Sequence, residues 1–425
     1  MTTKTTQPVQ GMSDLGPPEI HIWQEIEQTT RRIMALYGFE EVRTPIAEYT
    51  QVFTRSIGDT TDVVQKEMYT FEDRGGRQLS LRPEGTAGVM RYVAGFGPDA
   101  AGLRLYYVGP MFRCERPQAG RRRQFHQLGI EAIGAPNPAA DVEAIALQQH
   151  VFAEIGLKGL TVEVNTRGLP DDRAAVAKGL ASALKPHLGA LCEDCRRRYE
   201  TNILRILDCK QQACGEIVKS LPPVTDFMCD ESRRYLDEVL RLLGRLEIAV
   251  KVNPLLVRGL DYYVHTVWET RHPALGAQDA LSGGGRYRID LGSAAVEGVG
   301  FAAGIERLVT ALAHDASGGA RRSGHVPIWI VSHGARALEE NMVLAQALRM
   351  RGVVCGIDLA GRSMKAQMRE ANKASAGCVV IRGDLEIEKG IVVLKNMKDG
   401  AQEELDLPEA IERLVSAGRV EVLKS

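Results

Sequence analysis

The sequence predicts an α+β chain of several domains: an N-terminal part built on an antiparallel sheet, a helical insertion within it, and a C-terminal α/β domain. Its 425 residues exceed what one hydrophobic core usually organises. In the first 325 residues, strand-like segments follow one another without regular alternation with helices, which favours an antiparallel sheet. After residue 326, strand-like and helix-like segments alternate, which is typical of parallel strands covered by helices.

The composition is that of an ordinary globular protein, with 44% hydrophobic and 25% charged residues. No apolar run is long enough to span a bilayer, and the first residues lack the apolar core of a secretory signal. We therefore expect a cytoplasmic protein with no membrane partner, whose eight cysteines are reduced.

The net charge of −1 provides no general attraction to nucleic acid, so an RNA partner would have to be recognised by a local patch. Residues 104–123 form such a patch, with six arginines and a single acidic residue, Glu115.

The first 81 residues predict a helix, an interrupted strand and a hairpin. Apolar residues recur at helical spacing over 19–37. The strand that follows, 39–47, is interrupted at Pro45, because proline has no N–H for a sheet ladder. The turn 74–77 predicts a hairpin over 67–81.

Residues 112–131 predict two strands joined by an arginine-rich loop, because Pro117 and Gly120 interrupt the apolar strand-like runs. Arginines fixed on strands would hold a polyphosphate in one geometry, since each guanidinium is a rigid planar fork. The remaining elements that we expect before residue 326 are a helix over 141–155, a strand over 160–164, a helical cysteine-bearing region over 168–250, strands over 255–270 and 278–291, an apolar helix over 300–313 and a linker over 314–325.

The C-terminal region predicts a small α/β domain. Strands are expected over 326–331, 353–358 and 377–382, and they alternate with helices over 335–350 and 362–375.

Four segments place a charged residue next to glycine within an apolar frame, and a fifth is a glycine-rich loop. They are 81–86, 113–131, 256–263, 298–307 and the loop 282–287. Taken singly, each has a simpler interpretation: Arg258 and Asp261 could form a structural ion pair, and the glycines a tight turn. The spacing of glycines over 298–304 departs from a dinucleotide fingerprint, so we expect no Rossmann site.

Together, these segments resemble the motifs of the class II aminoacyl-tRNA synthetases, and within them those of the histidyl-tRNA synthetase family. Motifs 1, 2 and 3 of the class are resembled by residues 38–45, 112–131 and 300–307, respectively. The two histidine signatures are resembled by residues 256–263 and 282–287. Residues 362–368 resemble part of the family's anticodon-binding domain. The resemblance implies a class II catalytic domain over 1–167 and 251–320, a helical insertion domain over 168–250 and an anticodon-binding domain over 326–425.

The resemblance implies ATP-dependent attachment of L-histidine to tRNA(His), for protein synthesis, through a histidyl-adenylate intermediate. ATP would be a co-substrate, with Mg²⁺ on its β- and γ-phosphates. A homodimer is implied by motif 1 alone.

The resemblance also implies the residues of the site. Arg113 and Arg258 would be catalytic, because cations aimed at the α-phosphate lower the barrier of adenylate formation. Histidine would be bound by Glu84, Gly85, Thr86, Arg113, Gln127, Glu131, Arg258, Tyr262, Tyr263 and Tyr287, and ATP by Arg113, Glu115, Arg121, Arg123, Phe125 and Arg307. We expect Glu131 to accept from an imidazole N–H, and Phe125 either to stack on adenine or to pack in the strand core.

Two segments depart from the family pattern. The family's Arg-Gly-Met near the start is Gln10-Gly11-Met12 here, which weakens a role for this position in substrate contacts. The glycine loop usually continues Arg-Tyr-Asp-Gly, whereas here Arg288 follows Tyr287, so we expect a different loop exit.

Cysteines in the helical region have spacing compatible with a zinc site: Cys192-x2-Cys195-x13-Cys209-x4-Cys214. The alternative is four reduced thiols that serve as small core residues, and the sequence favours this alternative over zinc.

Two other classes of function compete. A non-catalytic, synthetase-like regulatory subunit of histidine biosynthesis would typically lack the anticodon-binding domain and lose signature residues, yet Arg113, Arg258 and Arg307 are all present. A protein that only binds RNA would not need a histidine-shaped pocket of Glu131 and two tyrosines.

Overall fold

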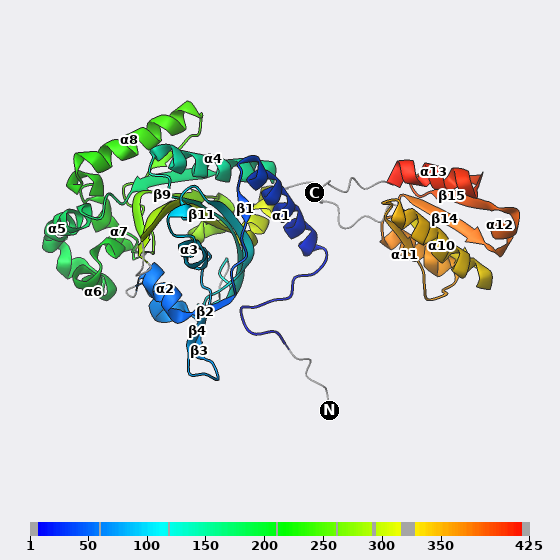
Figure 1. Cartoon of the computed structure of the whole chain (residues 1–425), viewed down its shortest axis with the longest axis horizontal. Helices are drawn as coiled ribbons and strands as arrows, with labels where there is room; N and C mark the ends of the chain where they lie inside the picture. Colours follow the sequence, from blue (N-terminus) through cyan, green and yellow to red (C-terminus); the bar gives the residue numbers. More distant parts are fainter. Residues whose placement is uncertain are drawn as a thin grey trace. The chain divides into compact units, whose positions relative to one another are not determined.

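Figure 1 shows the computed structural model of the chain. It describes residues 7–58, 61–117, 120–209, 211–260, 262–290, 295–315 and 328–418. The chain divides into two compact units, Met1–Gly319 and Ala320–Ser425, each with its own hydrophobic core. None of the helices in the described ranges is long and apolar enough to cross a membrane.

An eight-stranded sheet forms the centre of the first unit, with strand order β1-β5-β6-β11-β10-β9-β7-β8. All its inner pairs are antiparallel, and only the edge pairs β1–β5 and β7–β8 are parallel, so the antiparallel sheet is confirmed. The strands are β1 (Glu40–Glu41), β5 (Arg104–Phe112), β6 (Gln124–Ile133), β7 (Thr161–Thr166), β8 (Lys251–Val252), β9 (Tyr263–Arg271), β10 (Ala280–Asp290) and β11 (Ala295–Gly304).

Helices cover both faces of this curved sheet (Figure 1). On the convex face lie α1 (Glu19–Leu36), α4 (Pro138–Glu154) and α9 (Ile305–Asp315), whose apolar residues pack on Trp268 and Phe301 of the sheet. On the concave face lie α2 (Thr50–Ile57) and α3 (Thr86–Ala94), followed by η2 (Gly97–Ala100). The predicted helices at 19–37 and 141–155 are confirmed as α1 and α4.

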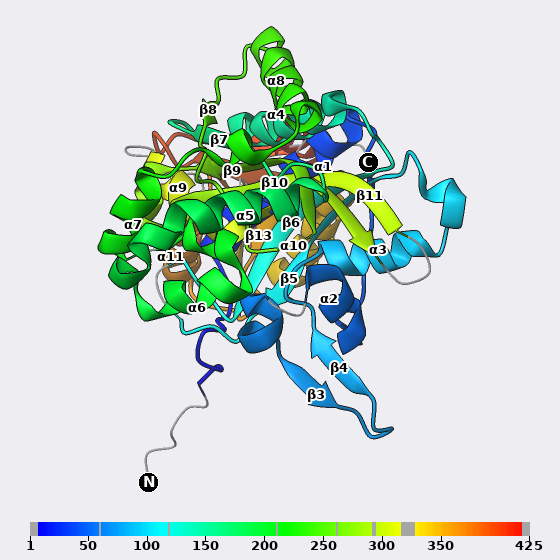
Figure 2. The same cartoon turned by 90° about the vertical axis from the view of Figure 1, so that its left-hand side faces the viewer.

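Pro45 separates two strands that belong to different sheets, which confirms the predicted interruption. β1 joins the large sheet, and β2 (Ala47–Tyr49) joins β4 (Gln78–Leu81) and β3 (Thr70–Glu72) in a small sheet of order β2-β4-β3. The β3–β4 hairpin confirms the prediction and projects from the body (Figure 2). A short π-helix, η1 (Val63–Glu67), precedes it.

The helical insertion is confirmed and has a core of its own, in which Leu180, Leu184, Ile206 and Val218 are buried. Its elements are α5 (Asp172–Leu184), η3 (Lys185–Ala190), α6 (Glu193–Thr201), η4 (Ile203–Ile206), α7 (Gln212–Lys219), η5 (Val224–Phe227) and α8 (Asp230–Arg245). Leu236, Val239 and Leu243 of α8 instead join the core of the large sheet, so this helix connects the insertion to that sheet.

The C-terminal unit contains a five-stranded sheet of order β13-β12-β14-β15-β16. The parallel strands that the alternation predicts are β12 (Ile328–His333), β13 (Cys355–Ile357) and β14 (Cys378–Gly383). Two antiparallel strands, β15 (Ile391–Asn396) and β16 (Gln402–Asp406), were not predicted. The helices are α10 (Ala335–Met350), α11 (Met364–Lys373), α12 (Asp384–Lys389) and α13 (Leu407–Gly418).

Three predictions for the N-terminal part are wrong in detail. The glycine-rich segment 282–287 is not a loop but the middle of β10, because β9 and β11 bond it on both sides. The helix predicted over 300–313 begins only at residue 305, because residues 300–304 pair with β6. The strand predicted over 255–270 begins at Tyr263.

The two strands joined by an arginine-rich loop that were predicted over 112–131 are confirmed, because the arginines after residue 112 lie in the connection between β5 and β6 rather than on the strands themselves. A hydrogen bond from the Arg113 N–H to the Arg123 carbonyl, at 2.8 Å, closes the base of this connection. Of the predicted linker, residues 316–325 lie outside the described residues, as does Asp261.

Candidate active site

A cleft of about 310 Å³ opens where the β5–β6 connection faces β10, β11 and the start of α9. Arg113, Phe125, Gln127, Arg258, Gly283 and Arg307 line it. These residues come from segments far apart in the sequence, and the eight-stranded sheet brings them together because β6, β11 and β10 are neighbours.

Behind the cleft lies a group of buried polar side chains around Glu131, whose exposed fraction is 1%. Tyr262, Tyr263 and Tyr287 form one side of it, with ring centroids 4.7 Å apart for Tyr262–Tyr263 and 5.9 Å apart for Tyr262–Tyr287. The structure therefore collects the residues expected to surround an imidazole ring.

Glycines make the space for these side chains. Gly300 pairs with Glu131 across the β6–β11 ladder, and a Cβ at Gly300 would lie 2.3 Å from Glu131 Oε2. A Cβ at Gly285 would lie 2.6 Å from the Tyr263 ring. The glycine-rich stretch of β10 is therefore a wall without side chains, against which larger groups pack.

Glu84 is fixed at the start of α3. Its two carboxylate oxygens accept from the backbone N–H groups of Thr86 and Ala87, each at 2.7 Å. Burial raises the pKa of Glu84 above its usual range, and these backbone donors oppose the shift. The first turn of α3 therefore fixes the positions of Glu84 and Thr86, next to the buried polar group around Glu131.

Several polar atoms of the buried group have no hydrogen-bond partner in the described part of the chain. They are Glu131 Oε2, Gln127 Oε1 and the hydroxyls of Tyr107 and Tyr287. Burial raises the pKa of Glu131 to about 8. Buried polar groups are normally satisfied, so this concentration of unpaired atoms points to a polar ligand.

Sequence reasoning missed Tyr107 on β5, which is 5% exposed. Its ring occupies the space left by two glycines: a Cβ at Gly85 would lie 2.2 Å from the ring, and a Cβ at Gly129 2.5 Å from the hydroxyl. In the sequence, Tyr107 is marked only by the alternation of inward and outward side chains along a strand. That alternation does not show whether an inward side chain lines a pocket or packs in the core.

Arg258 is oriented by a second residue that sequence reasoning missed, Glu269 of β9. Arg258 Nη1 donates to Glu269 Oε1 at 2.5 Å, and Arg271 Nη2 donates to the other oxygen at 3.0 Å. Gly283 pairs with Glu269 across the β9–β10 ladder, and a Cβ there would lie 2.2 Å from Arg258 Nη1. Glycine at 283 is therefore what lets Arg258 cross β10 to reach its partner.

At the mouth of the cleft, Arg113 lies over the ring of Phe125, with its guanidinium carbon 5.2 Å from the ring centroid. Its Nε donates to the Pro83 carbonyl at 3.0 Å. Phe125 lines the cleft and also packs at the edge of the core. Its position is therefore compatible with both alternatives that the sequence left open, stacking on adenine and packing in the strand core.

Glu115 and a backbone carbonyl of β10 hold two further arginines of the cleft, Arg121 and Arg307. Arg121 Nη1 donates to Glu115 Oε2 at 2.7 Å, and Arg307 Nη1 to the Ala280 carbonyl at 2.6 Å. Burial lowers the pKa of Arg307, and the nearby charges of Arg121 and Arg113 lower it further. A cleft in which cations crowd one another is suited to a polyanion.

Arg123 does not line this cleft, whereas Arg122, which was not predicted, does. Instead, Arg123 lies against the N-terminal segment: its N–H donates to the Gly11 carbonyl at 2.8 Å. A Cβ at Gly11 would lie 2.9 Å from Arg123 Cγ. The segment around Gly11 therefore supports the β5–β6 connection.

Comparison with known proteins agrees with this geometry. Residues 11–308 match the family model described as Histidyl-tRNA synthetase, and residues 325–417 match the model of an anticodon binding domain. This chain belongs to the histidyl-tRNA synthetase family. The resemblance and the class II fold inferred from the motifs are thereby confirmed.

Curated relatives of the chain carry the name histidine–tRNA ligase. One, from Halothermothrix orenii, is 44% identical over 95% of this chain and 97% of its own length. Another, from Desulforudis audaxviator, is 45% identical over 95% and 97%. Among solved structures, apo histidyl-tRNA synthetase of S. aureus has a TM-score of 0.80 at 33% identity, covering 96% of this chain and all of its own.

The fold alone is shared with an ATP phosphoribosyltransferase regulatory subunit/histidyl-tRNA synthetase from Bacillus halodurans. The TM-score is 0.66 at 22% identity, over 90% of this chain and 100% of the other.

Proposed function

We propose that the cleft attaches L-histidine to tRNA(His) in two steps, with ATP as co-substrate. The observation that carries this proposal is the buried carboxyl group of Glu131, whose Oε2 has no hydrogen-bond partner among the described residues, beside a cleft lined by Arg113, Arg258 and Arg307. One end of the site suits a small polar ring, and the other suits a triphosphate.

In the first step, the histidine carboxylate attacks the α-phosphorus of ATP, and pyrophosphate leaves. Arg113 is placed to hold the α-phosphate and the carboxylate, and Arg258 to approach the same phosphate from across the cleft. Two anions must meet in this reaction, so fixed guanidinium groups lower the barrier by positioning and by charge stabilisation. The Arg258–Glu269 contact supports this role, because it holds Arg258 in one orientation.

ATP is held by the remaining cleft residues. Arg307 would bind the γ-phosphate and Phe125 would stack on adenine, while Glu115 orients Arg121 towards the ATP tail or the tRNA end. Arg123 supports this connection from behind. Mg²⁺ would be bound together with the phosphates of ATP, where it would neutralise part of their negative charge.

Histidine is selected by the buried group. Glu84, Thr86 and Gln127 would take the α-amino group, beside Gly85, and Tyr262, Tyr263 and Tyr287 would surround the imidazole. Glu131 would accept from an imidazole N–H, which gives its unpaired oxygen a partner. A site that hydrogen-bonds its substrate strongly rejects analogues that lack the bonding group.

In the second step, a ribose hydroxyl at the 3′ end of tRNA takes the histidyl group, and AMP leaves. The C-terminal unit would bind the anticodon. We propose the same domain limits that the sequence predicts, with the insertion domain at 168–250 and the anticodon-binding domain at 326–425.

A cytoplasmic homodimer is part of the proposal. Exposed apolar side chains on β2, on α3 and just after α3 support it: Tyr49 is 46% exposed, Tyr92 41% and Phe96 40%. A salt bridge of 2.6 Å between Glu48 and Arg91 shows that β2 and α3 are neighbours. Light scattering of the purified protein would test this, and a monomer mass at micromolar concentration would exclude the dimer.

The regulatory-subunit alternative is less well supported. The arginines that adenylate formation needs are present and enclose a cleft, and residues 325–417 match an anticodon binding domain. Histidine- and ATP-dependent pyrophosphate exchange decides between the two. Exchange is expected, and its absence with histidine would refute the proposed function.

A further inference from the structure

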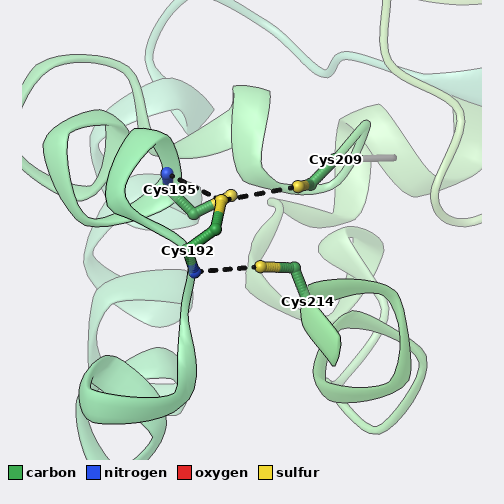
Figure 3. Close-up of side chains that lie close together, drawn as sticks. All are labelled: Cys192, Cys195, Cys209 and Cys214. Carbon is green, nitrogen blue, oxygen red and sulfur yellow. Dashed lines mark hydrogen bonds between the residues drawn. The ribbon is translucent and has the colours of Figure 1, made fainter. Parts of the chain in front are cut away.

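The four cysteines of the insertion converge at one point (Figure 3). Cys192 caps the N-terminus of α6, Cys195 lies in the first turn of that helix, Cys209 follows η4, and Cys214 lies in the first turn of α7. All four Sγ atoms lie within 4.8 Å of one another. Residues separated by 22 positions are therefore brought to a single sulfur cluster.

The spacing of the sulfur atoms suits a metal better than a disulfide. Cys192 Sγ and Cys209 Sγ are 3.9 Å apart, far beyond the ~2.05 Å of a disulfide. Thiolates at ~2.3 Å from a tetrahedral zinc ion would be separated by about 3.8 Å. The observed distance between the two sulfur atoms is close to the sulfur–sulfur distance expected around a tetrahedral zinc ion.

Backbone donors are aimed at the sulfurs. The Cys195 N–H donates to Cys192 Sγ at 3.4 Å, and the Cys192 N–H donates to Cys214 Sγ at 3.2 Å. These two contacts orient the Cys192 and Cys214 sulfur atoms within the cluster.

We propose that Cys192, Cys195, Cys209 and Cys214 bind one structural Zn²⁺ as four thiolates. Binding replaces the thiol protons, which are released to solvent. Four sulfur ligands in a tetrahedral arrangement favour zinc over the hard ions that oxygen ligands bind. The arrangement is closed, with four protein ligands and no open position, so the ion would be structural rather than catalytic.

The proposed ion would hold a segment that reaches the active site. Between Cys195 and Cys209 lies Arg205, whose Nη2 donates to Asp62 Oδ2 at 2.5 Å. Arg205 Nη1 also lies 2.9 Å from where a Cβ on Gly259 would be, one residue after Arg258. Arg205 is therefore paired with Asp62 and lies beside the segment that carries Arg258.

Such a cross-link meets a need of the insertion. Its helices α6 and α7 have nine and eight residues, and short helices are marginal without tertiary support. Small helical domains often rely on a metal or disulfides because their cores bury little surface.

Metal analysis of the full-length enzyme, purified without chelators, tests the proposal. We expect about one zinc per chain, since a tetrahedral four-cysteine site holds a single ion. Exchange for Co²⁺ should give thiolate charge-transfer and tetrahedral d–d absorption. Cys192→Ser and Cys209→Ser, at the two half-buried ligands, should lose the zinc and the cobalt spectrum. Cys229→Ser, at an exposed cysteine of the same insertion, should keep both.

Zinc well below one per chain, together with no cobalt–thiolate absorption in the unmodified enzyme, would overturn the proposal. So would a mass spectrum that shows the four cysteines joined as disulfides. If the serine variants do not fold, the cobalt spectrum of the unmodified enzyme decides the question. None of these readouts depends on charging activity, so a failure here leaves the proposed function intact.

Discussion

Gly300 lies opposite Glu131 in the β6–β11 ladder, and a Cβ there would lie 2.3 Å from Glu131 Oε2 and 2.1 Å from the Ile130 carbonyl. Replacement of Gly300 by alanine therefore displaces the carboxylate or the strand. We expect Gly300→Ala to cost about 1–3 kcal/mol of unfolding free energy, as overpacking usually does, and to raise the KM for histidine. Urea unfolding and pyrophosphate exchange measure the two effects.

Gly304→Ala is the matched control for stability. A Cβ at Gly304 would make only ordinary contact, 3.6 Å from Arg307 Cδ. If Gly300→Ala proved as stable as Gly304→Ala and kept its histidine KM, the close fit of Gly300 to Glu131 would have no consequence.

Arg258 should be sensitive even to lysine. A lysine cannot donate to Glu269 through a planar fork and also reach a phosphate, so its position would be lost. We expect Arg258→Lys to lower the rate of histidine-dependent pyrophosphate exchange by about 10²-fold, the usual effect of losing one donor to the transition state. Arg288→Lys, at an exposed arginine of β10 that is paired with Glu297, should keep the full rate.

Arg307 should affect ATP more than histidine. Its guanidinium lies at the cleft, where it donates to the Ala280 carbonyl. Loss of a charged hydrogen bond costs about 1.5–3 kcal/mol, so Arg307→Ala should raise the KM for ATP roughly 10- to 100-fold. The KM for histidine should stay near the unmodified value. Equal increases in both constants would contradict a γ-phosphate role; Arg74→Ala, at the exposed hairpin tip, is the control.

Glu131 should make stability depend on pH. Its pKa is raised to about 8 by burial, so the folded chain keeps a proton that the unfolded chain releases above its ordinary value of 4.5. The folded state then binds more protons between these values, and its unfolding free energy falls as pH rises from 4.5 to 8.

Glu131→Gln removes this titration. The stability of the glutamine variant relative to the unmodified enzyme should therefore grow over the same pH range, by on the order of a few kcal/mol. Denaturant unfolding at several pH values checks the trend. A difference that stays constant from acid to neutral pH would show that Glu131 is ionised in the folded, unliganded enzyme.

The larger elements of the fold could be predicted from the sequence, because hydrophobic periodicity and turn residues indicate where helices, strands and turns lie. The helices α1 and α4, the β3–β4 hairpin and the helical insertion all follow from such local signals. The prediction of a loop at the triple glycine, residues 283–285, was wrong for a physical reason. Glycine alone predicts a turn, but here β9 and β11 bond the segment on both sides, and its missing side chains make room for Arg258 and Tyr263.

The missing members of the candidate site illustrate the same limit. Glu269 and Tyr107 sit on strands whose alternation is ordinary, and only the sheet brings them to Arg258 and Gly129. The cysteine spacing likewise left zinc and core packing open. The convergence of the four sulfur atoms, which is tertiary information, is what favours the metal.

The most direct test of the account is histidine-dependent pyrophosphate exchange by Glu131→Ala, with the KM for histidine and the KM for ATP measured separately. If Glu131 accepts from the imidazole, losing that bond should raise the histidine KM about 10- to 100-fold and leave the ATP KM unchanged. A histidine KM equal to that of the unmodified enzyme would contradict the assignment of the buried pocket to histidine.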